Sequence, residues 1–329
     1  MVLLLPYLLS IFNFLENQDI MVKHIYLDRI NASSVSDNVL VFNLNKDYIN
    51  IRHMVVSENY FYISPGEEDY KGFSTSISKL SKSGSFIGEI YRSKNDKLIK
   101  SLGYYAEKKL LIVAHNNKIL SIDINNNKVA KEVEVDKSIT RIRIYKNKLY
   151  VAGFQYTDNS EIYYLDTYDP ISLKFLETKK EMKYGLENKI FRHSSLSSSN
   201  NELFVSMGKV NEIYSSIDGF KNPIISFENL YNKKPSLGNI LFSSNQGLVG
   251  KFATTNFKYI NDSYIFFYDL KSDKQYLSKN GENSGFYDDV KNSGFYRPLF
   301  TNSKEYMFSY KKNNTNENKI SIILFKIKS

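Results

Sequence analysis

Short apolar runs alternate with turn-forming residues between positions 140 and 177. The four runs cover residues 142–145, 149–154, 162–168 and 171–176. They are separated by Lys-Asn, Asp-Asn-Ser and Asp-Pro, which favour turns because Asn and Asp tolerate the left-handed backbone and proline fixes φ. The pattern therefore predicts a four-stranded antiparallel meander.

The third run recurs along the chain as a segment that begins with isoleucine. The steps between these isoleucines are 42, 43, 51, 52 and 55 residues, at Ile77, Ile119, Ile162, Ile213, Ile265 and Ile320. A repeat of this length, built of strands that cannot bury both faces alone, is typical of the blades of a β-propeller. The sequence thus predicts an all-β fold, a six-bladed β-propeller of four-stranded antiparallel blades. The blades are expected at residues 51–91, 98–135, 140–177, 190–230, 240–277 and from 295 onward.

The last repeat, residues 319–328, has the character of a third strand. A sheet without its outer strand leaves an open edge, so we expect residues 39–44 to pair with it and close the ring. Between blades five and six, Asn-Ser-Gly-Phe-Tyr occurs twice, at residues 283–287 and 292–296. We expect an aromatic loop there, either in contact with a ligand or packed on itself.

Residues 2–15 are almost entirely apolar. The stretch is too short to cross a bilayer, which takes about 20 residues, and no transmembrane span is expected. It has the length of the apolar region of a signal peptide, although a basic start is missing. We expect an export signal within residues 1–20, or else a short helix docked on the ring, followed by one propeller domain over residues 21–329.

Composition narrows the classes of partner. The chain contains no cysteine, which excludes disulfides and thiolate chemistry. The formal charge of +9 comes mainly from lysines scattered through turns, whereas a nucleic-acid footprint would cluster. A monomer is expected, with a protein or an anionic small molecule or glycan as its partner and no nucleic acid.

From Asn50 onward the chain resembles the TolB-like six-bladed β-propellers of the bacterial envelope. The resemblance rests on repeats such as KILSID at residues 118–123 and NKLYVA at residues 147–152. It implies an exported, periplasmic protein and supplies no catalytic residues to carry over. The absence of tryptophan argues against WD repeats, which need a Trp-Asp pair in each blade.

Motifs of established catalytic chemistry are missing. The sequence has no phosphate-binding loop, no dinucleotide fingerprint, no H-E-x-x-H and no G-x-S-x-G. No cofactor is expected. The favoured interpretation is a non-catalytic binding or scaffold propeller of the cell envelope. The alternative is a channel-centred hydrolase or lyase acting on an anionic glycan, in which a His or Tyr transfers the proton.

Arginine is unevenly placed. Five of the seven arginines fall in predicted inner strands, which line the channel of a propeller: Arg52, Arg141, Arg143, Arg192 and Arg297. Because the guanidinium group binds carboxylate or phosphate through two parallel hydrogen bonds, we expect Arg52, Arg141, Arg192 and Arg297 to converge on an anion. The alternative is that they form ion pairs in a plugged channel.

Two of these arginines are followed by histidine, at His53 and His193. Both histidines are candidates for ligand contact. A metal site is not expected, because the adjacent arginines would repel a divalent cation. Successive residues of a strand point to opposite faces, so Arg52 and His53 are not expected to face the channel together.

Overall fold

The computed structural model describes residues 23–27, 29–67, 71, 73–94, 97–185, 193–199, 201–208, 212–226, 236–255, 260–279, 285–292, 294–299, 301, 303, 305–313 and 316–328. The expected export signal within residues 1–20 and the candidate residue Arg192 lie outside them. Within the described part of the chain, no helix is long and apolar enough to cross a membrane.

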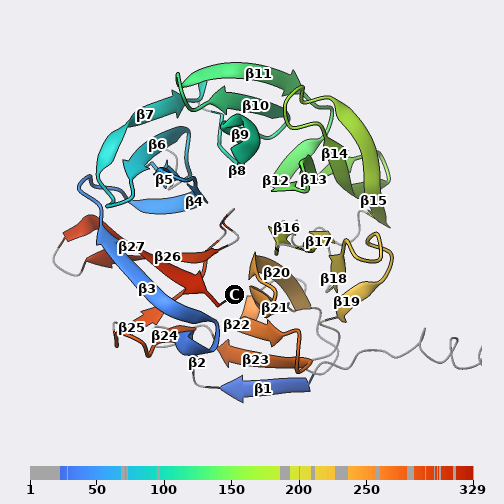
Figure 1. The fold of residues 1–329 in the computed structure, drawn as a ribbon. Coiled ribbons are helices and arrows are strands. Elements are labelled where there is room, and N and C mark those ends of the chain that lie inside the picture. Colours follow the sequence, from blue (N-terminus) through green and yellow to red (C-terminus); the bar gives the residue numbers. More distant parts are fainter. Residues whose placement is uncertain are drawn as a thin grey trace, which may run out of the picture.

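The first four sheets each contain four antiparallel strands in sequence order (Figure 1). Blade 1 consists of β4 (Asn50–Val56), β5 (Tyr60–Gly66), β6 (Ser76–Ser81) and β7 (Phe86–Arg92). Blade 2 consists of β8 (Ser101–Tyr105), β9 (Leu110–Ala114), β10 (Lys118–Asp123) and β11 (Lys128–Glu134). Blade 3 consists of β12 (Ser138–Tyr145), β13 (Lys148–Tyr156), β14 (Ser160–Tyr168) and β15 (Phe175–Gly185). Blade 4 consists of β16 (His193–Ser198), β17 (Leu203–Gly208), β18 (Glu212–Ser215) and β19 (Pro223–Ser226).

The remaining three sheets mix strands from both ends of the chain. Blade 5 consists of β20 (Ser236–Ser243), β21 (Gly247–Thr255), β22 (Ile260–Asp269) and β23 (Lys274–Lys279), with β1 (Lys23–Leu27) added in parallel to β23. Blade 6 is small, with β2 (Ile30–Asn31), β24 (Phe286–Asp288) and β25 (Gly294–Tyr296). Blade 7 consists of β26 (Tyr306–Asn313), β27 (Asn316–Ile327) and β3 (Ser36–Asn43). Two 3-10 turns, η1 (Ala32–Ser34) and η4 (Ala106–Lys108), lie among these strands.

The prediction of six blades is wrong, because the described strands form seven sheets. The sheet that the repeat pattern missed is blade 6, whose strands are two or three residues long and contain none of the six isoleucine-led repeat segments. The resemblance to the TolB-like six-bladed family is therefore also wrong, because the described sheets number seven. The envelope location was inferred from that resemblance and no longer has support from it.

Part of each copy of the tandem Asn-Ser-Gly-Phe-Tyr repeat lies in β24 and β25. The expected loop is wrong at these residues, and the two copies pair with each other. The two strands are antiparallel, with Phe286 opposite Tyr296 and Tyr287 opposite Phe295. Directly opposed residues share a face of the sheet. Phe286 and Tyr296 are accordingly buried, while the rings of Tyr287 and Phe295 lie 5.1 Å apart on the other face.

The strand expected at residues 39–44 is present as β3. It pairs antiparallel with β27, with Val39 opposite Phe325 and Asn43 opposite Ser321. The backbone N–H of Leu44 donates to the carbonyl of Ile320 at 2.9 Å. Segments nearly 280 residues apart in sequence are therefore joined in one sheet.

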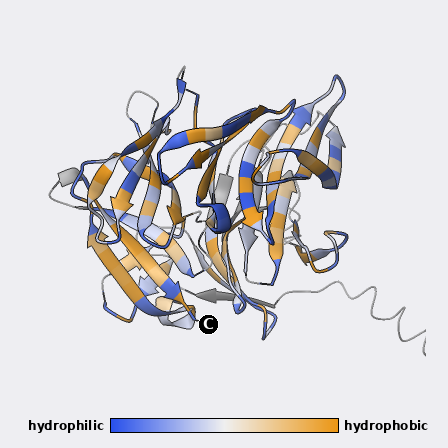
Figure 2. Cartoon of the chain, turned by 45° about the horizontal axis from the view of Figure 1, so that its top comes forward, coloured by the Kyte–Doolittle hydropathy of each residue, from blue (hydrophilic) through white to orange (hydrophobic). Residues whose placement is uncertain are grey.

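The core lies between successive blades. Hydrophobic and hydrophilic positions interleave along the strands (Figure 2), so that each sheet presents apolar side chains to its neighbours. Between blades 1 and 2, for example, Val55 and Tyr62 pack with Leu102 and Val113. The inner strands surround the centre of the ring (Figure 1). Burial of side chains between blades holds these strands in place, and the starts of three of them carry the candidate site.

Candidate functional site

A cationic residue stands near the start of the inner strand in each of the first three blades. Arg52 is near the start of β4, Lys100 directly precedes β8, and Arg141 is near the start of β12. Inner strands of a propeller begin on the same face of the ring. The three cations therefore come together on one face.

A cavity of about 360 Å³ lies among these residues. Its lining includes Arg52, His53, Lys100 and Arg141, together with residues of blade 7. Because blades 1, 2, 3 and 7 all contribute, the cavity lies over the centre of the ring. We call the surface formed by Arg52, Phe73, Lys100 and Arg141 the cationic mouth.

The expectation that Arg52 and His53 face opposite ways is wrong, since both line this cavity. The pairing of β4 with β5 shifts register between Ile51 and His53. Arg52 is the extra residue of a β-bulge, which interrupts the alternation of side chains and redirects the residues that follow.

Arg141 lies where three cavities adjoin, since it lines the 360 Å³ cavity, a second of about 390 Å³ and a third, much smaller space. Its Nη1 atom donates to the carbonyl oxygens of Lys100 at 3.0 Å and Thr140 at 2.9 Å. These two hydrogen bonds fix the guanidinium between blades 2 and 3. Among the described residues that line the three cavities there is no Asp or Glu.

Phe73 belongs to the connection between β5 and β6, and its ring lies beside two cations of the mouth. The Cζ atom of Arg52 lies 4.7 Å from the centroid of its ring, and the Nζ atom of Lys100 lies 6.0 Å from it. Both are within cation–π range. The side chain of Phe73 is still 44% exposed, so an incoming ligand can reach it.

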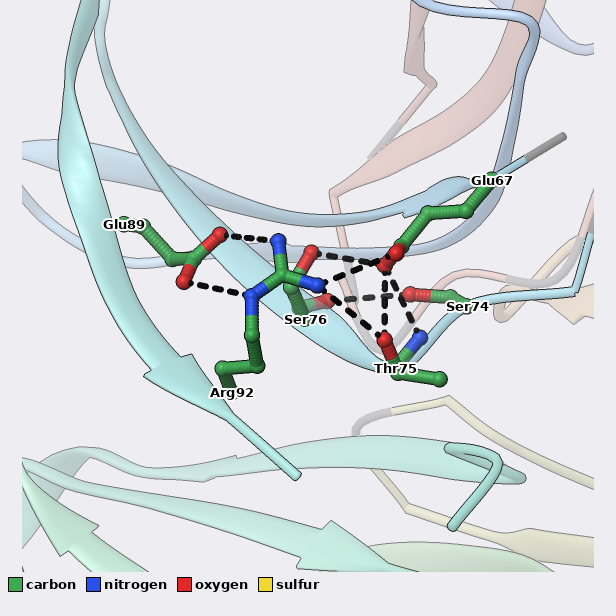
Figure 3. A network of polar contacts seen from close by, with 6 residues as sticks. All are labelled: Glu67, Ser74, Thr75, Ser76, Glu89 and Arg92. Carbon is green, nitrogen blue, oxygen red and sulfur yellow. Dashed lines mark hydrogen bonds and ion pairs between the residues drawn. The ribbon is translucent and has the colours of Figure 1, made fainter. Parts of the chain in front are cut away.

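A polar network anchors the segment that carries Phe73 (Figure 3). The carboxylate of Glu67 accepts hydrogen bonds from the backbone N–H of Thr75 at 3.2 Å, from its hydroxyl at 2.9 Å and from Arg92 Nη1 at 3.0 Å. Arg92 also forms an ion pair with Glu89 at 2.6 Å. The backbone N–H of Glu67 donates to the carbonyl of Phe73 at 2.8 Å, which ties the network to the mouth.

Burial and mutual repulsion shape the charges of the mouth. Burial, with Arg141 and then Arg52 nearby, lowers the pKa of His53 to about 3, so its imidazole is neutral at pH 7. Burial and Arg141 also lower the pKa of Lys100. Burial lowers the pKa of Arg141 to about 10, which leaves it charged at neutral pH. The mouth is therefore a cluster of like charges around a neutral histidine.

Arg143, which follows on β12, has a different role from Arg141. It is 2% exposed, its Nε donates to Ser198 Oγ at 2.8 Å, and its Nη1 donates to the carbonyl of Thr301 at 2.6 Å. Its Nη2 reaches the carbonyls of Ser198 and Ser303. Arg143 thus joins blades 3 and 4 to the connection between blades 6 and 7 through carbonyl and hydroxyl acceptors.

Only part of the predicted arginine cluster comes together. Arg52 and Arg141 both belong to the mouth. Arg297 is exposed and does not line the described cavities of the mouth. It lies near Lys251, whose pKa is lowered mainly by burial and further by Arg297. Arg192 is outside the described residues. His193 begins β16 opposite Gly208. The described residues contain no group of three or more His, Asp or Glu that could hold a metal ion.

Sequence reasoning missed Lys100 and Phe73. Lys100 could have been found by comparing the starts of the inner strands, because it directly precedes β8 while Arg52 and Arg141 lie near the starts of β4 and β12. No local signal marks Phe73, because its position depends on how the connection from β5 to β6 folds over the ring.

No protein-family model matches the chain, and no curated protein matches its sequence. Among solved structures it is similar to the Pan2 WD40 domain of Neurospora crassa, at 12% identity and a TM-score of 0.45 over 85% of this chain and 76% of that one. It is also similar to hydrazine synthase of Kuenenia stuttgartiensis, at 14% identity and a TM-score of 0.49 over 81% and 75% of the two chains. The AfRom2 CNH domain gives 10% identity and a TM-score of 0.47 over 89% and 100%. Similarities this weak assign neither family nor function, and the β-propeller fold rests on the strand pairings themselves.

Proposed function

We propose that the protein is a binding propeller whose cationic mouth captures an anionic ligand. The observation that carries the proposal is the convergence of Arg52, Lys100 and Arg141 from three blades on adjoining cavities whose described lining contains no acidic residue. A bound anion would offset the repulsion among these cations.

Arginine suits this role because its planar donors match carboxylate and phosphate oxygens. Arg141 is held by backbone carbonyls, so little side-chain entropy remains to be lost on binding. Arg52 is exposed and can adjust to the ligand. The combination is that of a partly preorganised anion site.

The low pKa of His53 favours binding over proton transfer. A catalytic acid or base works best when its pKa lies near the working pH. With a pKa of about 3, His53 is a weak base and carries no proton to donate at pH 7.

Titration calorimetry with citrate at low ionic strength tests the proposal. Charge-assisted hydrogen bonds contribute about 1.5 to 3 kcal/mol, so Arg52→Gln should raise the Kd for citrate roughly 10- to 100-fold. Added salt should weaken binding, since it screens exposed charges.

Arg297→Gln is the matched control, because it removes an exposed arginine outside the described cavities of the mouth. It should leave the Kd for citrate within about twofold of the parent value, which corresponds to under ~0.5 kcal/mol. If the parent protein bound neither citrate nor sulfate, or if both variants weakened binding equally, the mouth would not be an anion site.

A further inference from the structure

We infer that the ligand of the cationic mouth is a polyhydroxylated acid, such as a sugar acid, with its acid group at Arg52, Lys100 and Arg141 and its hydroxyl groups in the adjoining cavity. This inference rests on the proposed function and narrows it to a chemical class. It follows from a difference between the two cavities.

The second cavity, of about 390 Å³, shares Phe73, Lys100 and Arg141 with the first and adds several uncharged polar residues to its lining. These are Asn116, Ser138, Thr140 and Ser194, beside the ring of Phe154. Hydroxyl and amide groups both donate and accept hydrogen bonds. This cavity therefore suits a ligand part that also donates and accepts, which a carboxylate or phosphate oxygen cannot do.

The hydroxyl group of Ser194 could take a hydrogen-bond partner from the ligand. Ser194 is 4% exposed, it lines the second cavity, and its Oγ atom has no hydrogen-bond partner among the described residues. A buried hydroxyl without a partner destabilises the folded protein. A hydroxyl group of the ligand would satisfy it.

The side chain of Asn50 offers a similar buried polar atom to the first cavity. Its Oδ1 atom is buried and has no hydrogen-bond partner among the residues that the structure describes, and the residue lines the same cavity as Arg52. Oδ1 accepts hydrogen bonds and cannot donate, so an anionic oxygen cannot pair with it. A ligand hydroxyl beside the acid group can.

One molecule can reach both cavities because they adjoin. Phe73, Lys100 and Arg141 line each of them. The acid group on one side of Arg141 and a hydroxylated ring on the other would use the charged, aromatic and hydroxyl groups of the mouth together.

Three probes of similar size separate the contributions. D-Glucuronate carries a carboxylate and hydroxyls, cyclohexanecarboxylate carries only the carboxylate, and D-glucose carries only the hydroxyls. Each satisfied hydrogen bond contributes a few-fold to tenfold in affinity. We expect glucuronate to bind roughly 10-fold more tightly than cyclohexanecarboxylate, and glucose to bind most weakly.

Ser194→Ala should weaken glucuronate binding about fivefold and leave cyclohexanecarboxylate binding unchanged. The matched control is Ser121→Ala on β10. Ser121 is also buried, its Oγ has no hydrogen-bond partner in the described part of the chain, and it does not line these cavities. It should change neither Kd.

The outcomes distinguish the two proposals. Equal binding of glucuronate and cyclohexanecarboxylate would overturn the sugar-acid class and leave anion capture standing. Failure of every anion, citrate and sulfate included, would overturn both. Loss of glucuronate preference in Ser194→Ala but not in Ser121→Ala would support the inference.

Discussion

The guanidinium of Arg52 lies over the ring of Phe73, with its Cζ atom 4.7 Å from the ring centroid. Arg52 lies on β4 and Phe73 in the connection between β5 and β6, and they meet because a β-bulge turns Arg52 and this connection brings Phe73 over the ring. An aromatic face attracts a cation and limits the positions that it can take. Phe73 therefore orients the most exposed cation of the mouth.

Replacing Phe73 with Ala should weaken the binding of citrate about threefold, because an exposed cation–π contact contributes about 0.5 to 1 kcal/mol. The free energy of unfolding should fall by only ~1 kcal/mol, since nearly half of the side chain is exposed. Calorimetry and urea unfolding measure the two effects. Phe175→Ala, on outer strand β15 and similarly exposed, should leave citrate binding unchanged; equal losses in both variants would remove Phe73 from the site.

Glu67 should make stability depend on pH. Burial alone would raise the pKa of Glu67, but hydrogen bonds from Thr75, Arg92 and Ser76 outweigh it and lower the pKa below 4.5. The stabilisation is then complete above pH 4.5 and is lost as the pH falls through the lowered value. At pH 7, Glu67→Gln should reduce the free energy of unfolding by about 1 to 2 kcal/mol.

Urea unfolding of the parent and of Glu67→Gln at pH 7 and pH 3 measures this effect. The difference between the two proteins should be smaller at pH 3 than at pH 7, because stabilisation by the carboxylate is lost as the pH falls toward its lowered pKa. Glu89→Gln is the control, because its ion pair with Arg92 is more exposed and should contribute no more than ~0.5 kcal/mol. A difference that is constant with pH would contradict the role of Glu67.

The low pKa of His53 predicts a second dependence of stability on pH, at higher pH than that of Glu67. The folded protein keeps His53 neutral down to about pH 3, whereas the unfolded chain takes up the proton near pH 6.5. The unfolded state thus binds more protons in between, and stability falls as the pH drops from 6.5. The slope contributed by one such group is at most ~1.4 kcal/mol per pH unit.

Unfolding measured at pH 7.5, 6.0 and 5.0 tests this effect, because Glu67 stays ionised over that range. His53→Gln should reduce the loss of stability on acidification, with His115 supplying part of what remains, since burial lowers the pKa of His115 too. A parent slope that the His53 substitution leaves intact would show that His53 is protonated in the folded state.

Arg143 should matter for stability rather than for ligand binding. Arg143→Met would leave the carbonyls of Thr301, Ser198 and Ser303 without the donors that they now have. We expect a loss of about 3 to 5 kcal/mol in the free energy of unfolding. Arg143→Lys should restore part of the lost free energy of unfolding, because lysine keeps the charge but lacks the planar set of guanidinium donors. If the Met variant were as stable as the parent, Arg143 would not hold the blades together.

The sequence pattern located the strands of the regular blades because each repeats the same alternation of apolar runs and turns. Ile119, Ile162 and Ile213 all lie in the third strands of their blades. The candidate site could be predicted only in part from the sequence. Arg52 and Arg141 followed from their place on inner strands, but the bulge at Arg52 depends on pairing with β5, and Phe73 depends on contacts that only the folded chain makes.

Blade 6 was hidden because its strands take their partners from opposite ends of the chain. β2 pairs with β24 through Ile30 and Phe286, and Gly285 accepts a hydrogen bond from the backbone of Ile30 at 2.9 Å. Two-residue and three-residue strands carry no measurable alternation. Their stability must come from burial of a few large side chains, which can be tested directly.

Phe286 is the strongest such test. It is fully buried in a cluster that also contains residues of blades 5 and 7, so Phe286→Ala should reduce the free energy of unfolding by about 3 to 5 kcal/mol. Phe295 holds the same position in the second copy of the tandem repeat but lies on the other face of the sheet, partly exposed. Phe295→Ala should therefore cost no more than ~1 to 2 kcal/mol in urea unfolding. Equal losses at the two positions would mean that the copies are not paired antiparallel, because only that pairing places one phenylalanine inside and the other outside.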